Sequence, residues 1–259
     1  MKVLVNGCSH SKLGYSTFIH VEGERILIEP PKKYNPSWQR YLAKKLNLKK
    51  FLGINTNYKP APTKQNDFRE FVPLEWVFEW DENNSIISLA TDGKGNDSIM
   101  MDTLSTLRGF ENKGEKIDLV LIQFSGPTRR LVSPHNIRYA YANPHDNFEY
   151  GLNFEPSGSL LTLHNMVILQ DYLKKGGYAY YFLNYFGLDE SVKDEEIYKE
   201  LDLSHFITYK DNHPIFDGWL DRIKKDNLAI DDDGHPSLEL MQIISDKFCD
   251  KILKNKAFI

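Results

Sequence analysis

The sequence predicts an α/β protein with a mainly parallel, doubly wound sheet and helices on both of its faces. Short apolar runs typical of buried strands alternate along the chain with segments in which apolar residues recur at helical spacing. The run 117–124 is nearly continuous in branched and apolar residues, as expected of a parallel strand that is covered on both faces. From Ser237 onward, apolar residues recur four apart, which is typical of a helix packed on a sheet. We therefore expect parallel strands joined by right-handed crossovers.

Length and composition narrow the class of protein. The chain has 259 residues, which suits one domain over 1–259, with insertions expected at about 55–84 and 127–158. Hydrophobic residues make up 41% and charged residues 26%, as in an ordinary soluble globular protein, and the formal net charge is -4. We find no basic patch of the size that a nucleic-acid binder or a membrane-surface binder needs, so neither partner is expected.

Cysteine usage and hydropathy indicate the compartment. Two cysteines, Cys8 and Cys249, do not make a disulfide framework, which favours a reducing environment. The first residues lack the apolar core of a signal peptide, and no run approaches the length of a membrane span. We therefore expect a soluble, cytoplasmic protein. The basic cluster of Lys44, Lys45, Lys49 and Lys50 is expected to be the solvated face of a helix.

The first part of the chain predicts a strand, a hairpin and a helix. Val3 to Val5 form a short apolar strand that Asn6 and Gly7 end. The stretch 17–29 alternates apolar and polar residues and predicts a hairpin that turns around Glu22 and Gly23. A helix is then expected from Asn35-Pro36, because proline is tolerated in a first turn.

The middle of the chain predicts a strand, a glycine-bearing turn and a helix. The run 86–90 reads as a buried strand, and Gly93 to Asn96 turns it into a helix that continues through Leu107. Asn96 is expected to cap this helix. The stretch 127–158 has no helical or alternating period, and loops this long in compact domains are usually functional. We therefore predict that it forms a lid or a substrate-binding loop.

The remaining elements are expected in the following order: a helix from Ser159 to Gly176-Gly177, a strand 178–183, a charged, exposed helix 189–201, a partly helical segment 215–225 and the closing helix from Ser237.

Two polar segments, near the two ends of the chain, carry residues of the types used in nucleophilic catalysis. Ser9 follows the first strand, and the carboxyl end of a strand in an α/β fold is where a side chain can face a ligand crevice. Asp232 lies three residues before His235, on a segment that Gly234 and Pro236 keep out of a helix. A serine hydroxyl becomes a good nucleophile when an imidazole takes its proton and a carboxylate holds the other ring nitrogen.

These segments resemble the sequence blocks of the SGNH, or GDSL-type, hydrolases. Gly7-Cys8-Ser9-His10-Ser11 is similar to the opening Gly-Asp-Ser block, and the segment from Asp232 to Pro236 resembles the closing Asp-x-x-His block. The segment 90–96 looks like the second, glycine-bearing block, and the strand 117–123 resembles the one that leads into the third. The four segments follow each other in the order of the family.

The resemblance implies a fold, an activity and roles for residues. The fold would be the three-layer sandwich of this family, and the activity would be that of a carboxylic ester hydrolase. Ser9 would be the nucleophile, His235 the general base and Asp232 its orienting partner. The oxyanion would be held by Ser9 together with Gly93, Gly95 and Asn96. The substrate would be an ester of a carbohydrate or of another small polar molecule, and no cofactor is implied.

The chain departs from the family pattern in two blocks. Cys8 stands where the family usually has aspartate. The third block normally reads Gly-x-Asn-Asp, whereas this chain has Ser125-Gly126-Pro127-Thr128. The asparagine that donates to the oxyanion is therefore missing, and Asn96, Ser125 or Thr128 could replace it. Loss of one such donor costs about 100- to 1000-fold in rate, so a weakened or inactive member stays an alternative.

Four further interpretations stay open or are set aside. Cys8 paired with His235 is a chemically sensible alternative nucleophile, because an imidazole can lower the pKa of a thiol. Arg129 and Arg130 are candidates for binding an acidic group of a substrate. The competing class is a non-catalytic module that binds a glycan or a protein partner. A metal site is not expected, because none of the following residues has the spacing of two ligands on one helix face: His135, His145, Asp146, Asp211 and His213.

Overall fold

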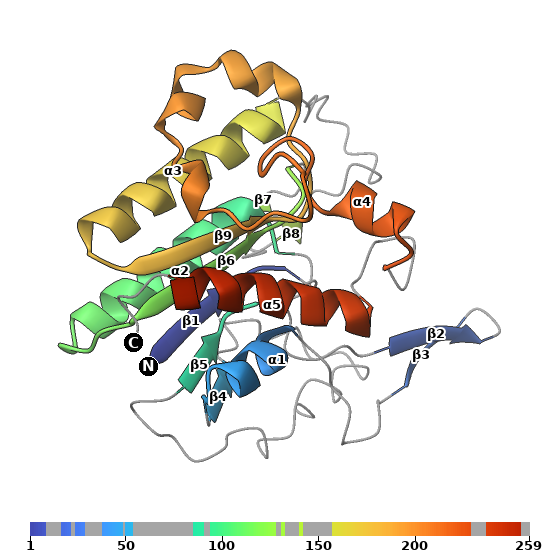
Figure 1. The fold of residues 1–259 in the computed structure, drawn as a ribbon, viewed down its shortest axis with the longest axis horizontal. Helices are drawn as coiled ribbons and strands as arrows, with labels where there is room; N and C mark the ends of the chain where they lie inside the picture. Colours follow the sequence, from blue (N-terminus) through green and yellow to red (C-terminus); the bar gives the residue numbers. More distant parts are fainter. Residues whose placement is uncertain are drawn as a thin grey trace.

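The computed structural model describes residues 1–8, 17–21, 24–28, 38–48, 50–53, 85–90, 94–127, 131–132, 140–141, 157–228 and 237–254. These residues form a central sheet with helices on both faces (Figure 1). The sheet has five strands in the order β4-β5-β1-β6-β9, and every neighbouring pair is parallel. Its strands are β1 (Lys2–Asn6), β4 (Lys50–Gly53), β5 (Ser85–Ser88), β6 (Leu119–Phe124) and β9 (Ala179–Asn184). The predicted parallel α/β sheet is confirmed.

Alternate residues of β1, β5, β6 and β9 pack against helices on opposite faces. Val3 and Val5 belong to one buried cluster with α1 (Trp38–Lys45) and α5 (Leu238–Lys254). Leu4 belongs to a second cluster with α2 (Asn96–Glu111) and α3 (Ser157–Lys175). The two clusters make the three layers of the molecule. Each of these four strands therefore has one apolar set for each face, which explains their continuous apolar runs in the sequence.

The chain changes face at the central strand. The connection that follows β1 contains α1, which packs on the first face. The connections that follow its two neighbours, β5 and β6, contain α2 and α3, which pack on the second face. Connections that leave neighbouring strands toward opposite faces open a crevice at the carboxyl ends of those strands. The carboxyl end of β1 therefore lies between two such switch points.

Several predicted elements are confirmed. All six residues of β6 are buried. Helix α5 buries its apolar residues at the predicted spacing of four, which are Leu240, Ile244, Phe248 and Ile252. Helix α3 ends where Gly177 adopts a φ of +64° and the Tyr178 N–H donates to the Leu173 carbonyl at 3.0 Å. This is the terminating arrangement that glycine favours after a helix.

The smaller elements lie outside the main sheet. The predicted hairpin is present as β2 (Thr17–Val21) paired antiparallel with β3 (Glu24–Ile28). A second antiparallel pair, β7 (Leu131–Val132) and β8 (Ala140–Tyr141), lies inside the stretch predicted to have no period. Of the predicted segment 215–225, Leu220–Lys225 forms α4. The expected insertion at 55–84 lies outside the described residues.

Three expectations about local structure are wrong. The segment 189–201 is not an α-helix but two 3-10 helices, η4 (Glu190–Asp194) and η5 (Glu196–Glu200), with Glu195 extended between them. A third, η6, covers Leu203–His205. The buried Val192 and the half-buried Ile197 are five residues apart, so one α-helical face cannot carry both toward the core.

The other two corrections concern Lys50 and Asn96. Lys50 does not lie on a helix: it begins β4, because the helix before it ends where Asn47 adopts a φ of 53°. Asn96 is the first residue of α2 and not its cap, a position that Gly95 takes. The Asn96 side chain instead hydrogen-bonds across to the end of β6. No helix in the described part of the chain has the length and apolar character that crossing a membrane requires.

Candidate functional site

The carboxyl edge of the sheet is the candidate site. The residues predicted for catalysis and for substrate binding lie mostly outside the described residues: Ser9, Asp232 and His235, with Gly93, Thr128, Arg129 and Arg130. Cys8 and Ser237 lie beside these segments and are described, as are Gly95 and Asn96 of the second block. The frame that holds the predicted site can therefore be built from its described neighbours.

Asn6 ends β1 and is fully buried. Its Nδ2 donates to the Ile99 carbonyl and to Thr103 Oγ1, both at 2.9 Å, which fixes the side chain on helix α2. Its Oδ1 accepts from the Gly7 N–H at 2.8 Å and from Lys94 Nζ at 3.0 Å. A buried amide that makes all four of these bonds has little freedom to rotate. The turn that leads to Ser9 therefore starts from a fixed position.

Lys94 is a buried cation beside this turn. Its side chain is 2% exposed, and its Nζ lies 2.6 Å from Asp102 Oδ2. It also donates to the carbonyl of Leu89, which follows β5, at 2.8 Å. Burial lowers the pKa of Lys94 from its ordinary value, while the charge of Asp102 and its hydrogen bond act in the opposite direction.

Cys8, which precedes the predicted nucleophile Ser9 in the sequence, is buried. Gln123 of β6 donates from Nε2 to its Sγ at 3.6 Å. This contact joins the turn after β1 to the neighbouring strand, so Cys8 packs inward where the family usually has an aspartate. The described geometry gives Cys8 a packing role, and its use as an alternative nucleophile stays a prediction.

Asn96 joins the second block to the third. Its Nδ2 donates to the Ser125 carbonyl and to Thr162 Oγ1, both at 3.0 Å. Its Oδ1 accepts from the Ser125 N–H at 2.6 Å. The two Nδ2 hydrogens of Asn96 therefore bond to Ser125 and to Thr162, and the N–H of Ser125 bonds back to Asn96. Whether either residue donates to an oxyanion stays a prediction.

The described residues on either side of the segment 229–236, which carries Asp232 and His235, are bonded to each other. The Ser237 N–H donates to the Leu228 carbonyl at 2.8 Å. Ser237 Oγ accepts from the Leu240 N–H at 3.2 Å, as an N-terminal cap does. Helix α5 runs antiparallel to β1, so that its last residues lie near the start of β1 (Figure 1). The start of α5 therefore lies on the side of the sheet where the strands have their carboxyl ends (Figure 1).

The segment that enters this loop is anchored on the end of β9. The Tyr185 carbonyl accepts from the N–H groups of Trp219 and Leu220, both at 2.9 Å. Gly187 and Gly218 cross so closely that a Cβ on either would overlap the backbone of the other segment. This tight crossing fixes the start of α4 against the sheet, and α4 leads through Leu228 into the loop.

Two other features of the described residues do not form an active site. The Ser204 hydroxyl donates to Asp202 at 2.6 Å, and the His205 Nδ1 lies 2.9 Å from the Tyr180 carbonyl. The serine is thus bonded to the carboxylate and not to the imidazole, unlike a catalytic triad. Within the described ranges, no three His, Cys, Asp or Glu side chains come close enough to hold a metal ion.

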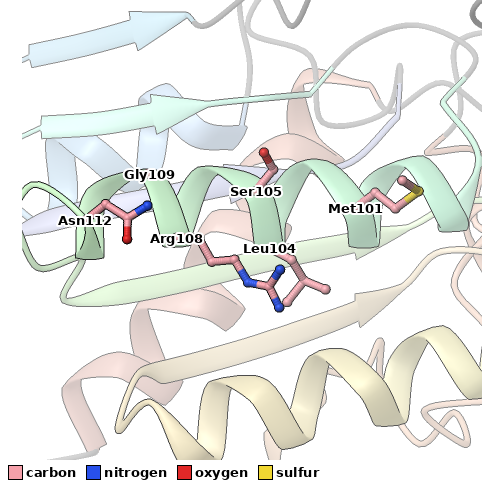
Figure 2. A pocket seen from close by; sticks show the side chains of 6 residues that line it. All are labelled: Met101, Leu104, Ser105, Arg108, Gly109 and Asn112. Atoms are coloured by element: carbon pink, nitrogen blue, oxygen red, sulfur yellow. The ribbon is translucent and has the colours of Figure 1, made fainter.

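A shallow hollow lies along the outer face of α2, away from the carboxyl ends of the strands (Figure 2). It is lined by residues from successive turns of this one helix, which are Met101, Leu104, Ser105, Arg108, Gly109 and Asn112. These residues lack a nucleophile with a neighbouring base, so the hollow has no catalytic chemistry of its own.

Comparison with known proteins gives distant structural likenesses only. No family model matches the chain, and no curated protein matches it. The chain is similar to a catalytic mutant of an acetylxylan esterase from Geobacillus stearothermophilus, with 12% identity and a TM-score of 0.43 over 97% of this chain and 93% of that one. It is also similar to a protein from Arabidopsis thaliana, with 10% identity and a TM-score of 0.45 over 98% of both chains. Likenesses at this level assign neither a family nor an activity.

Sequence reasoning missed the residues that build the frame. Asn6 was interpreted only as the end of a strand, although a polar residue in the last position of an apolar strand is a signal for a side chain with buried partners. Lys94 gave no signal, because a lysine in a glycine-bearing turn is ordinarily exposed. Gln123 lay inside the predicted strand, and its contact with Cys8 depends on the pairing of β1 with β6.

Proposed function

We propose that the protein is a serine hydrolase that cleaves an ester at the carboxyl end of β1. One observation carries the proposal: Cys8, next to Ser9, contacts Gln123 near the end of β6, and the start of α5, next to the segment with Asp232 and His235, lies on the same side of the sheet (Figure 1). The central strand there lies between two switch points, where α/β proteins bind ligands. The order of the sequence blocks supports the same assignment.

In the proposed reaction, Ser9 Oγ attacks the ester carbonyl while His235 takes the hydroxyl proton and Asp232 orients the imidazole. The tetrahedral oxyanion accepts hydrogen bonds from backbone N–H groups of Ser9 and of the Gly93–Asn96 turn. The N–H group of Asn96, the first residue of α2, suits this role, because the first N–H group of a helix has no carbonyl acceptor within the helix, whereas that of Ser98 already donates to Asp97 Oδ1. His235 then protonates the leaving alcohol, and water cleaves the acyl-enzyme by the same two steps.

The substrate class in this proposal is an acyl ester of a carbohydrate or of another small polar molecule. Arg129 and Arg130 would bind an acidic group of such a substrate. A non-catalytic binding module is the second candidate, and one observation favours it. The Ser125 N–H, in the block that normally supplies an oxyanion donor, is already bonded to Asn96. Loss of that donor would slow catalysis by about 100- to 1000-fold.

Hydrolysis of p-nitrophenyl acetate by the purified protein tests the proposal. We expect Ser9→Ala and His235→Ala each to lower kcat/KM by at least about 1000-fold, because triad residues act as a unit. Ser11→Ala, which changes a serine two positions away, is the matched control and should keep the wild-type rate. A serine-directed phosphonate should label Ser9, as located by mass spectrometry.

The outcomes separate the candidates. Equal rates in wild type, Ser9→Ala and His235→Ala would contradict a hydrolase and favour the binding module. Loss of activity in Cys8→Ala with retention in Ser9→Ala would assign the reaction to the thiol instead. A rate that depends on His235 but not on either nucleophile would contradict the acyl-enzyme.

A further inference from the structure

The buried ammonium group of Lys94 joins three elements at the carboxyl edge. Its Nζ lies 3.0 Å from Asn6 Oδ1 on β1, 2.8 Å from the Leu89 carbonyl after β5 and 2.6 Å from Asp102 Oδ2 on α2. An ammonium group has three N–H donors, and here three acceptors lie within hydrogen-bond distance. All three N–H donors of Lys94 therefore have an acceptor inside the protein.

A buried ion pair is a costly way to hold a fold together. Desolvation of the two charges can exceed their attraction, and apolar residues of the same volume often stabilise a protein as well or better. What such a pair can supply is one defined arrangement of its neighbours. The neighbour of Lys94 with the most direct link to the predicted site is Asn6.

Asn6 links the side chain of Lys94 to the backbone of Gly7. Its Oδ1 accepts both from Lys94 Nζ and from the Gly7 N–H, at 3.0 and 2.8 Å. Its Nδ2 is held on α2 by the Ile99 carbonyl and by Thr103 Oγ1. The Gly7 N–H is therefore the end of a buried chain of hydrogen bonds that starts at Lys94, and Gly7 begins the turn that leads through Cys8 to Ser9.

We propose that Lys94 is a positioning residue that fixes the turn after β1 through the side chain of Asn6. The effect on Ser9 rests on the proposed function, whereas the effect on the Gly7 amide does not. Lys94 acts through Asn6 and has no contact with the substrate in this proposal. Its removal frees Asn6 Oδ1 from one of two donors, which loosens the bond to Gly7 and with it the approach of Ser9 to the ester.

Hydrogen exchange at the Gly7 amide and phosphonate labelling at Ser9 test the proposal together. We expect Lys94→Met to speed exchange at Gly7 by about tenfold or more, the effect of weakening one buried hydrogen bond. Phosphonate labelling at Ser9 should be slower in the same variant. In the hydrolysis of p-nitrophenyl acetate, kcat should fall by a larger factor than KM changes. Lys2→Met is the matched control, because Lys2 begins β1 and, like Lys94, pairs with an acidic residue, but at the other edge of the sheet.

Asp102→Asn separates positioning from stability. It removes the ion pair but leaves the bonds of Lys94 to Asn6 and Leu89, so the variant should unfold more readily while Gly7 exchange under native conditions stays within about twofold of wild type. The proposal would be overturned if hydrogen exchange at the Gly7 amide were unchanged in a folded Lys94→Met variant. It would also be overturned if Lys2→Met accelerated that exchange as much as Lys94→Met does.

A second measurement needs no variant. Lys94 Nζ and the Gly7 N–H bond to the same oxygen, so a nuclear Overhauser effect between their protons is expected in the wild-type protein at low temperature. Its absence, once both signals are assigned, would overturn the proposal even if Lys94→Met fails to fold. Failure of the phosphonate to label wild-type Ser9 would instead contradict the proposed function and leave the Gly7 measurements to decide the role of Lys94.

Discussion

The two edges of the sheet treat their polar groups in opposite ways. At the amino edge, Lys2 pairs with Glu115 at 2.9 Å, and the Glu115 side chain is 37% exposed. At the carboxyl edge, polar side chains near or after the strand ends are buried and hydrogen-bonded inside the protein, among them Asn6, Lys94, Asn96 and Gln123. The ion pair of the amino edge is partly exposed, with the Lys2 side chain at 12% and that of Glu115 at 37%, whereas these polar side chains of the carboxyl edge are enclosed.

This difference indicates which part of the molecule needs one fixed arrangement of its side chains. Exposed pairs add little stability and tolerate several side-chain conformations. Buried polar groups must keep their partners, because each group left unpaired costs about 1 to 3 kcal/mol. The carboxyl edge is therefore the part of the molecule in which small errors of position are penalised, as a site that must align several groups requires.

The sharpest way to break the comparison is to remove one polar side chain from each edge. Asn6→Ala leaves several buried partners without a hydrogen bond and should lower the free energy of unfolding by about 3 to 5 kcal/mol. Glu115→Gln, at the amino edge, should lower it by less than about 1 kcal/mol. Urea unfolding monitored by tryptophan fluorescence measures both. Similar losses in the two variants would contradict the difference between the edges.

Two glycines make the same comparison for the backbone. A Cβ at Gly187, just past β9, would overlap the carbonyl of Phe216, so Gly187→Ala should cost about 2 to 4 kcal/mol. A Cβ at Gly109, near the end of α2 at the amino edge, meets nothing within 4 Å. Gly109→Ala should therefore stabilise the helix by about 0.5 to 1 kcal/mol. Thermal unfolding of both variants tests this, and a stable Gly187→Ala would show that the crossing can open.

The turn over the end of β9 should respond to acid. His213 Nδ1 accepts from the N–H groups of Ile215 and Phe216 at 3.2 and 3.3 Å, and burial lowers the pKa of His213 from its ordinary 6.5. Asp217 and Glu190 oppose this shift, and Lys193 adds to it. The unfolded chain therefore binds the proton first, and stability contributed by neutral His213 is lost as the pH falls below about 6.5.

His213→Gln is the variant that sharpens this expectation. It removes the titrating ring, so the drop in Tm between pH 7 and pH 5 should be smaller than in wild type. Asp202 and Asp226 do not interfere in this window, because their hydrogen bonds lower their pKa below the ordinary 3.8. An unchanged pH dependence in the variant would show that the turn does not depend on a neutral ring.

The fold could be predicted where burial leaves a period in the sequence. The strand at Leu119–Phe124 and the helix at Leu238–Lys254 are built from apolar residues whose spacing matches the element, so sequence and structure agree. The segment 189–201 failed because its few buried residues are spaced for two short turns and not for one helix. Its charged residues gave no information on this point.

The candidate site could be predicted only as residue types and order. Ser9, Asp232 and His235 stay predictions, whereas the frame around them depends on contacts between distant parts of the chain. Asn6 meets Lys94 and Thr103 because three elements converge, and no local pattern contains that meeting. The pattern around Asn96 predicts a helix cap for the same reason: its partner Ser125 follows β6, which is distant in the sequence.

The hydrogen bond between Ser237 and Leu228 has a consequence for engineering. It joins Leu228, which follows α4, directly to Ser237, which precedes α5, so the two ends of the segment 229–236 are linked to each other. Lengthening a closed loop costs little, about 0.6 kcal/mol for each doubling. A short glycine-serine peptide inserted after Ile230 should therefore leave the Tm almost unchanged. It should abolish any reaction to which Asp232 and His235 contribute.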